Sequence, residues 1–185
     1  MAEKPELVND THLSSSYKIP DSLYQFMQQV EDLKLISYQD PAKVWTVGVG
    51  HTGPEVKPGM VITHEQAKNY LQQDLQTSID CIVEYVLPDL NENQFHALIS
   101  FVFNIGVGAF INSGVLTQLN LKNFPAALAR LKQWNKATVG GKKVILKGLQ
   151  NRRQKEIDLF LTPSNKMIHL DDYGDLITEG ENPKV

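Results

Sequence analysis

Residues 31–52 read EDLKLISYQDPAKVWTVGVGHT, and this stretch decides how the rest of the chain is interpreted. Within it, residues 44–49 are rich in β-branched side chains, and glycine and proline recur over residues 36–62. This pattern predicts a small twisted antiparallel sheet. Because Pro41 restricts the preceding residue to extended backbone, Asp40 is expected at a strand end or in a turn, not inside a helix.

A helix is expected before this sheet. Asp21 or Ser22 can cap its N-terminus, and apolar residues then recur at helical spacing until about Leu35, namely Leu23, Phe26, Met27, Val30 and Leu33. Glu31 would lie at the edge of this apolar stripe. A carboxyl group there would be partly desolvated, which raises its pKa and suits a general acid. The alternative is a boundary glutamate that reaches water or pairs with a base.

Helical patterns follow the sheet. Thr63 and Gln66 form a capping-box pair, and the helix that they open continues to Pro88, which is long for a globular protein and can join two lobes. Asn91 is expected to cap a further helix that ends at Gly106. Three more helices are expected at 113–120, 124–136 and 148–161. The fold class is therefore α+β, mostly helical, with a small antiparallel sheet lobe and a long connecting helix.

The chain has 185 residues, of which 42% are hydrophobic and 21% charged, and these values fit one globular domain. Residues 1–20 and 163–185 lack sustained periodicity. We therefore expect an N-terminal tail at 1–20, a folded domain at 21–162 and an acidic C-terminal tail at 163–185. The single cysteine, Cys81, excludes a disulfide within the chain and is expected to be a small buried hydrophobic residue.

No apolar run approaches the roughly 18 residues that a membrane-spanning helix needs, and residues 1–20 contain no apolar leader segment. The chain is therefore expected to be held in the cytoplasm where it is made. No two of the five histidines stand four residues apart, so a helical zinc site is not expected. Neither a metal nor an organic cofactor is predicted.

Positive charge is concentrated in one segment. Residues 122–155 contain ten basic residues and no acidic one, whereas the remainder of the chain carries 8 basic and 21 acidic residues. Such a segment attracts polyanions, so it could bind an anionic polymer of a cell envelope. The alternative is a solvated basic helical face.

Three side chains have the chemistry of glycoside hydrolysis. Asp40 follows Glu31 by nine residues, and Thr46 follows Asp40 by six. A helix end, a turn and a strand can bring these side chains around one cleft, where two carboxylates and a hydroxyl could act on a glycosidic bond and a water molecule. Many proteins contain Glu and Asp nine residues apart, so this spacing needs further support.

The order of several motifs supplies that support. The Glu31, Asp40 and Thr46 spacing and the WTVGVGHT run at 45–52 resemble the active-site region of the phage-type lysozymes, which are endolysins of glycoside hydrolase family 24. Further resemblance lies in FVFNIG at 101–106, FINS at 110–113, Trp134, KGL at 147–149, NRR at 151–153 and Glu156. The resemblance covers residues 23–162. It implies the lysozyme fold, with a cleft between the sheet lobe and a larger helical lobe, and makes 21–162 a catalytic domain.

The resemblance also implies roles for individual residues. Glu31 would be the general acid, Asp40 would activate water or stabilise positive charge on the sugar, and Thr46 would position the water. Three residues match family positions near the bound glycan, and one matches a basic position that steadies the catalytic glutamate: Phe103, Asn104 and Ser113, and Arg152. Alternatives remain for some of these, since Phe103 could be a core aromatic, Ser113 a helix cap, and Arg152 and Arg153 surface or structural ion pairs.

The implied substrate is the β-1,4 bond between N-acetylmuramic acid and N-acetylglucosamine in bacterial peptidoglycan, cut when a phage lyses its host. Release through a holin, a monomeric state and residence in the host cytoplasm until lysis are expected with it. Two departures from the family concern the site: Asp32 follows Glu31 where the family usually has Gly, and Pro41, Ala42 and Lys43 stand where it often has a Gly in the turn.

Three other functions stay open. A lytic transglycosylase would cut the same bond without water and needs only one catalytic Glu, so Asp40 and Thr46 favour hydrolysis. A lysozyme-like module that binds the wall without cutting it would contain the same residues. A nucleic-acid binder would rest on the basic segment alone, and no DNA-binding motif supports it. The stereochemical outcome depends on the separation of the carboxylates.

Overall fold

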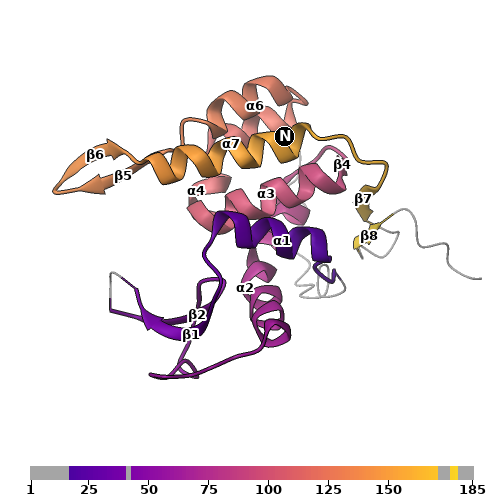
Figure 1. Ribbon diagram of the computed structural model, residues 1–185. Helices are drawn as coiled ribbons and strands as arrows, with labels where there is room; N and C mark the ends of the chain where they lie inside the picture. Colours follow the sequence, from indigo (N-terminus) through magenta and orange to yellow (C-terminus); the bar gives the residue numbers. More distant parts are fainter. Residues whose placement is uncertain (1–16, 41–42, 171–175, 179–185) are drawn as a thin grey trace, which may run out of the picture.

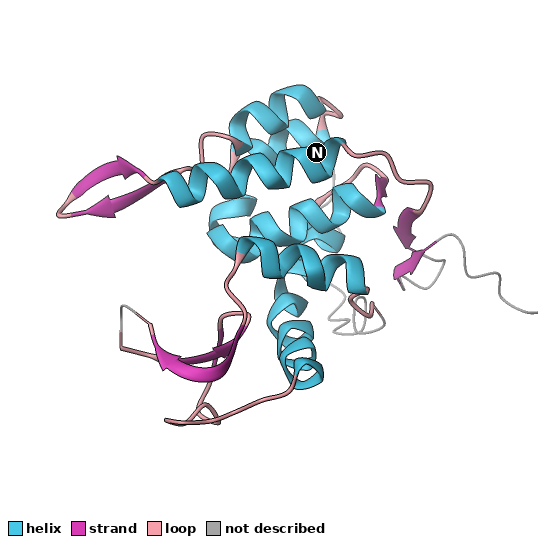
Figure 2. Cartoon of the chain, viewed as in Figure 1, coloured by secondary structure: helices cyan, strands magenta, loops and turns pink. Residues whose placement is uncertain are grey.

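The computed structural model describes residues 17–40, 43–170 and 176–178. Figure 1 shows a small sheet of β1 and β2 at one end of the molecule, a group of helices at the other, and the long helix α2 running from the sheet toward the helices. Figure 2 shows the same division by secondary structure, with a second β-hairpin projecting from the helical part. The expected α+β arrangement of a sheet lobe and a helical lobe is confirmed.

The sheet lobe follows directly on helix α1 (Asp21–Val30). Strands β1 (Lys34–Gln39), β2 (Trp45–Gly48) and β3 (His51–Thr52) form an antiparallel sheet in the order β1-β2-β3, with Tyr38 opposite Thr46. The sheet was expected within 36–62. The prediction that the first helix reaches Leu35 is wrong, because the chain turns to extended backbone after Val30. Leu33 and Leu35 continue the helical spacing by coincidence and pack instead on the core of the sheet lobe.

Helix α2 (His64–Tyr85) serves the cores of both lobes. Its first part contributes Ala67 to the small core of the sheet lobe, and its later turns bury Leu75 and Ile79 in the main core. The predicted capping box is present, since Thr63 and Gln66 satisfy one another's backbone N–H groups. Cys81, predicted to be buried, is buried in the main core.

The helical lobe is built around α3 (Glu92–Ile105), in which every residue from Phe95 to Val102 is buried. A helix buried on all sides lies at the centre of a lobe. Asn91 caps it in a second capping box, as predicted, and Gly106, with φ of 85°, separates it from α4. Around it lie α4 (Val107–Ile111), α5 (Gly114–Asn120), α6 (Phe124–Leu131) and α7 (Lys147–Leu161).

The hairpin of β5 (Lys136–Val139) and β6 (Lys142–Ile145) was not predicted. The helix expected at 124–136 ends at Leu131, and the chain continues into this hairpin instead. Gly140 and Gly141 form its turn with φ of 55° and 78°, a backbone conformation that favours glycine. The hairpin projects from the body of the molecule beside α7 (Figure 1).

A third sheet joins β4 (Leu90–Asn91), β7 (Met167–Leu170) and β8 (Leu176–Thr178). β7 pairs with β4, and Ile168 is buried in the main core. Tyr17 and Ile19 are buried in the same core. The packed body therefore includes residues on both sides of the expected 21–162, while residues 1–16, 171–175 and 179–185 of the expected tails lie outside the described part of the chain.

Candidate active site

Glu31 is the residue at which α1 ends. Its backbone N–H donates to the carbonyl oxygen of Met27, and its own backbone is extended, with φ of −124° and ψ of 143°. The prediction that Glu31 lies at the edge of a helical apolar stripe is therefore wrong. Glu31 lies instead at the junction of the helical lobe and the sheet lobe. Its side chain is 31% exposed and forms an ion pair with Arg152 of α7. A boundary glutamate was expected either to reach water or to pair with a base, and the structure shows the pairing with a base.

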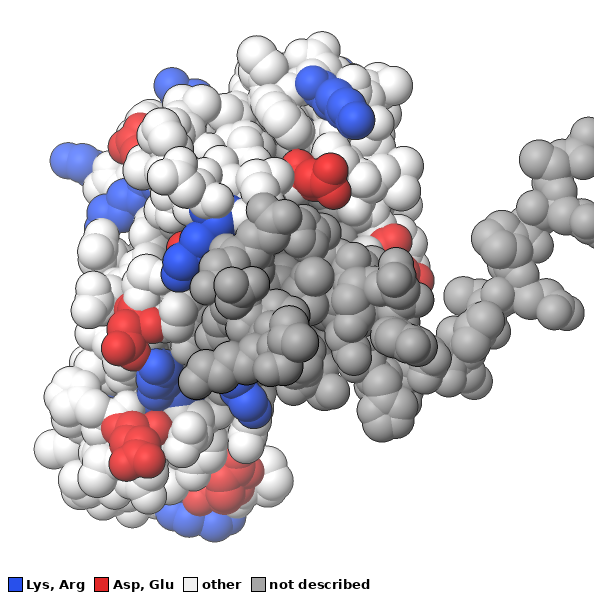
Figure 3. All heavy atoms as spheres, turned by 90° about the vertical axis from the view of Figure 1, so that its right-hand side faces the viewer, with Lys and Arg blue, Asp and Glu red and all other residues white. Residues whose placement is uncertain are grey.

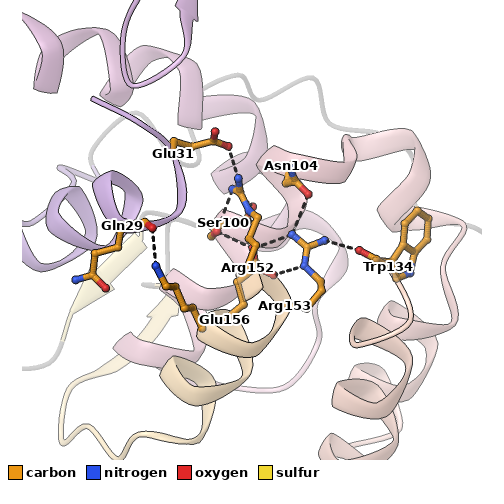
Figure 4. A network of polar contacts seen from close by, with 9 residues as sticks. Gln29, Glu31, Ser100, Asn104, Trp134, Arg152, Arg153 and Glu156 are labelled. Carbon is orange, nitrogen blue, oxygen red and sulfur yellow. Dashed lines mark hydrogen bonds and ion pairs between the residues drawn. The ribbon is translucent and has the colours of Figure 1, made fainter. Parts of the chain in front are cut away.

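Arg152 is held on several sides by the core of the helical lobe (Figure 4). Its Nε donates to Oε1 of Glu156 at 3.0 Å, and its Nη2 donates to the backbone carbonyl and the hydroxyl of Ser100 at 3.1 and 3.2 Å. Its Nη1 donates to Glu31. The planar guanidinium is thus fixed by three groups of the core, and it presents its remaining edge to Glu31.

Glu156 lies at the centre of this network and is completely buried. Burial raises the pKa of its carboxyl group, and the charges of Arg153 and Arg152 oppose that rise. Oε2 forms an ion pair with Nε of Arg153 at 2.7 Å, and the hydroxyl of Ser100 donates to Oε1 at 2.8 Å. Burial also lowers the pKa of Arg153, whose guanidinium nevertheless pairs with Glu156. Two arginines and two carboxylates, Glu156 and Glu31, therefore balance one another.

Asn104 is tied to the same network through Arg153. Nη2 of Arg153 donates to Oδ1 of Asn104 at 2.9 Å, and Nη1 donates to the backbone carbonyl of Trp134 at 3.3 Å. The guanidinium lies over the ring of Phe101, 4.9 Å from its centroid. The structure thus connects Glu31 and Asn104 through side chains of α3 and α7. Phe103 is half-buried and packs against the main core, as its core alternative predicted.

Asp40 and Thr46 lie on the β1–β2 hairpin and both bond to the same residue. Oδ1 of Asp40 accepts from the backbone N–H of Val44 at 2.8 Å, and Oγ1 of Thr46 donates to the carbonyl of Val44 at 3.1 Å. Asp40 follows the end of β1, as expected, and Thr46 is buried. The turn between them was expected to differ from that of the family, because Pro41, Ala42 and Lys43 stand where the family often has a Gly. Pro41 and Ala42 lie outside the described residues, and Lys43 has φ of 66°.

Tyr38 lies on β1, between the two candidate carboxylates in the sequence. Burial raises the pKa of its phenol, and the negative charges of Asp32, Glu31 and Asp40 raise it further. The ammonium of Lys34 lies over its ring at 3.9 Å. Because β1 runs from the end of α1 to Asp40, the strand places Tyr38 in the field of both predicted catalytic carboxylates.

Ser113 caps α5, where its Oγ accepts from the backbone N–H of Leu116 at 3.3 Å, so the helix-cap alternative is confirmed. Within the described ranges, no cluster of three or more histidine, cysteine, aspartate or glutamate side chains is arranged to hold a metal ion. None of the helices in those ranges combines the length and the apolar character that a membrane span requires.

No function was predicted from the sequence for the groups that hold Arg152. Ser100 was not singled out, Arg153 was considered a surface or structural ion pair, and Glu156 entered only as part of a motif. One signal was available, because Glu156 stands four residues after Arg152 and three after Arg153, which is the spacing of neighbours on one helix face. The burial of all three could not be read from that spacing.

The sequence model of one protein family, Phage lysozyme, matches residues 28–156. This range contains Glu31, Asp40, Thr46 and the whole network around Arg152. This chain belongs to the phage lysozyme family. Membership makes it a glycoside hydrolase of the lysozyme type, as the sequence predicted.

Individual relatives agree with the family. The endolysin of Salmonella phage P22 is 43% identical over 140 residues, covering 74% of this chain and 92% of that protein. The endolysin of Acyrthosiphon pisum secondary endosymbiont phage 1 is 40% identical over 134 residues, covering 72% and 91%. The structure is similar to the muramidase domain of SpmX from Asticaccaulis excentricus, with a TM-score of 0.73, 35% identity, and coverage of 80% of this chain and 99% of that one. The lysozyme fold is thereby confirmed.

Proposed function

We propose that this chain is an endolysin that hydrolyses the β-1,4 bond between N-acetylmuramic acid and N-acetylglucosamine in bacterial peptidoglycan. One observation carries the proposal: a partly exposed carboxylate, Glu31, is oriented at the junction of the two lobes by a guanidinium that the core holds on its other sides. The endolysins among its relatives support the substrate. The muramidase domain among the structural neighbours supports the choice of the bond that is cut.

In the proposed reaction, Glu31 gives a proton to the glycosidic oxygen as the bond to the sugar carbon breaks. The positive charge that develops on the sugar ring is stabilised by the carboxylate of Asp40. A water molecule, positioned by Thr46, supplies the hydroxyl that the sugar carbon gains, and its proton restores the acid. Because Asp40 is bound to the backbone of Val44, its carboxylate is fixed in place before the substrate arrives.

Arg152 acts in this proposal as a positioning residue. It contacts Glu31, while its bonds to Ser100 and Glu156 prevent it from following a displaced carboxylate. Its positive charge also stabilises Glu31 as the carboxylate that remains after proton transfer. Phe103, Asn104 and Ser113 are proposed to lie along the glycan, and of these Asn104 is held by Arg153.

The remaining elements of the proposal concern the cell. The protein stays in the host cytoplasm until a holin lets it reach the wall, where it acts as a monomer without a cofactor. The basic residues of 122–155 contact anionic polymers of the envelope, not nucleic acid. These elements rest on the resemblance to endolysins and on the distribution of charge in the sequence.

Mass spectrometry of the soluble fragments from purified peptidoglycan tests the reaction, with the wild type compared with Glu31→Gln. We expect fragments that end in reducing N-acetylmuramic acid, formed roughly 10²–10⁴-fold more slowly by the variant, because a positioned acid contributes that much to a rate. Asp32→Asn is the matched control, since it removes the adjacent, exposed carboxylate. Anhydro ends would instead identify a transglycosylase. Wall binding without fragments from either protein would identify a binding module.

A further inference from the structure

The β5–β6 hairpin exposes both charge and apolar surface. Its strands carry Lys136, Lys142 and Lys143, and all of β6 is exposed. Ile145 is 52% exposed and Val144 43%. Exposed apolar side chains that lie together and are rimmed by polar residues can mark a protein or membrane interaction site.

The pairing of the two strands determines which side chains share a face. Lys136 lies opposite Ile145, and Thr138 lies opposite Lys143. Paired residues and their second neighbours along a strand point to one side of a hairpin. Lys136, Lys143 and Ile145 therefore lie on the same face, where two cations flank an exposed aliphatic side chain.

A pocket at the base of this face adds a third cation. The pocket, of about 410 Å³, is lined by Gly114, Arg130, Gln133, Trp134, Lys136 and Lys143. The guanidinium of Arg130 rests on Gly114 so closely that a Cβ at that position would meet Nη1 at 2.7 Å. No acidic residue lines the pocket. Within the described residues, Arg130, Lys136 and Lys143 form no ion pair with a carboxylate, so their charges are available to an external anion.

This distribution of charge is local. A neighbouring pocket at the base of the same hairpin is also lined by Lys136, together with Lys132 and Ile145, and again by no acidic residue. By contrast, Figure 3 shows the end of the molecule away from the hairpin, where Lys and Arg side chains are interspersed with Asp and Glu on the described surface. The hairpin and its base thus combine basic and apolar side chains, and no acidic residue lines either pocket.

We propose that the β5–β6 hairpin is a docking site for a membrane surface that contains anionic phospholipids. Arg130, Lys136 and Lys143 bind headgroup phosphates, and Ile145 enters the boundary between headgroups and acyl chains. Basic and apolar side chains on one projecting element are the combination that binds such a surface. A soluble phosphate polymer would use the cations alone and leave Ile145 exposed to water, so the aliphatic side chain favours the membrane.

The inference extends the proposed function, on which it rests, since an endolysin works close to an envelope. It names a membrane partner for the hairpin part of the basic segment, and neither the hairpin nor the lining of its pocket includes Glu31, Asp40 or Thr46. Vesicle binding can therefore be present or absent whether or not the protein cuts peptidoglycan.

Vesicle cosedimentation of the full chain tests the proposal. Vesicles of phosphatidylcholine with phosphatidylglycerol are compared with vesicles of phosphatidylcholine alone, at low and high salt. We expect binding to the anionic vesicles that weakens with salt. The double variant Lys136→Gln/Lys143→Gln should lower the partition coefficient about 25-fold, because each cation near an anionic surface contributes roughly fivefold. Ile145→Ser should weaken binding while leaving the salt dependence unchanged.

Two variants keep the result interpretable. Lys18→Gln/Lys57→Gln removes two exposed lysines of other regions and should leave vesicle binding unchanged if the hairpin is the site. Arg130→Gln changes the pocket from helix α6, so its loss of binding does not depend on whether the hairpin variants fold. Cleavage of soluble peptidoglycan fragments, measured in parallel, shows that each variant is folded. Equal loss in the control, or binding to soluble polyphosphate but not to vesicles, would overturn the proposal.

Discussion

The two lobes each bury a histidine, and the two imidazoles respond in opposite directions. His51 of β3 and His96 of α3 are 6% and 1% exposed, and burial lowers the pKa of both. For His51, hydrogen bonds with Asp74 at 2.9 Å and Glu55 at 2.6 Å outweigh burial, and its pKa is raised. His96 instead meets the phenol of Tyr17 at 2.6 Å, and its pKa falls to about 4.

The difference shows that the partners of a buried group, more than its burial, decide which charge state the fold favours. Two carboxylates accept hydrogen bonds from both ring nitrogens of a charged imidazole, and Tyr70 stacks on the His51 ring with centroids 4.0 Å apart. A phenol donates to the free nitrogen of a neutral imidazole. Glu156 combines both influences: two guanidinium groups pair with its completely buried carboxylate, and burial still raises its pKa.

The largest effect should follow when this pairing is broken. Glu156→Gln leaves Arg152 and Arg153 buried without their shared carboxylate, so the free energy of unfolding should fall by about 3–5 kcal/mol. Urea denaturation measures this loss. Asp89→Asn, which neutralises an exposed carboxylate, is the control and should change stability by less than about 0.5 kcal/mol. Similar values for the two variants would show that the buried network adds nothing to stability.

A smaller effect should appear at His96 as a dependence on pH. Its pKa rises from about 4 in the folded chain to about 6.5 on unfolding, so the unfolded chain binds the proton more tightly. Above about pH 6.5 His96 is neutral in both states, and the free energy of unfolding has its full value. It decreases as the pH falls toward 4, by about 3 kcal/mol in total.

Stability measured in urea across this range should therefore decline for the wild type and decline less for His96→Gln. His64→Gln, at an exposed histidine, is the matched control and should follow the wild type. An unchanged slope in the His96 variant would assign the acid sensitivity to another group.

Arg152→Lys tests the cation that pairs with Glu31. Lysine keeps the positive charge but cannot donate at once to Ser100, Glu156 and Glu31 from a planar fork. We expect kcat/KM on soluble peptidoglycan fragments to fall about 100-fold, mainly in kcat, because Glu31 loses its orientation. Arg130→Lys makes the same exchange at an exposed arginine and should keep full activity. Equal activity of both variants would show that Arg152 does not position Glu31.

The smallest effect should come from the sheet lobe, and with the opposite sign to that of His96. Because the pKa of His51 is raised on folding, its contribution is present below about pH 6.5 and is lost as the pH rises through the folded value. Asp74→Asn should cost about 1–2 kcal/mol near pH 6 and less above pH 8. Denaturation at the two pH values checks this, and a cost independent of pH would mean that His51 carries no charge in the pair.

The parts of the fold that depend on near neighbours could be predicted from the sequence. The capping pairs of Thr63 with Gln66 and of Asn91 with Gln94 lie within one helical turn, so both helix starts were predicted correctly. The hairpin turn at Gly140 is equally local. It was missed because residues 137–147, between the helices expected at 124–136 and 148–161, were assigned no element, although two glycines between β-formers are a hairpin signal.

The rest depends on contacts between distant residues. The strand at Met167–Leu170 forms because β4 offers an edge, and neither segment predicts the other. At the candidate site, Glu31, Asp40, Thr46 and Arg152 were identified through motifs. The burial of Arg153 and Glu156 was not, because their charges suggest exposure, and only the packing of α7 on α3 shows that they satisfy one another.

The ion pair of Glu31 and Arg152 joins residues 121 positions apart. During synthesis Glu31 therefore leaves the ribosome long before its partner exists. The carboxylate gains its orienting cation only when α7 has been made and has docked on α3. The proposed activity thus appears with the completed molecule, and nascent chains that stall before Arg152 lack the oriented acid.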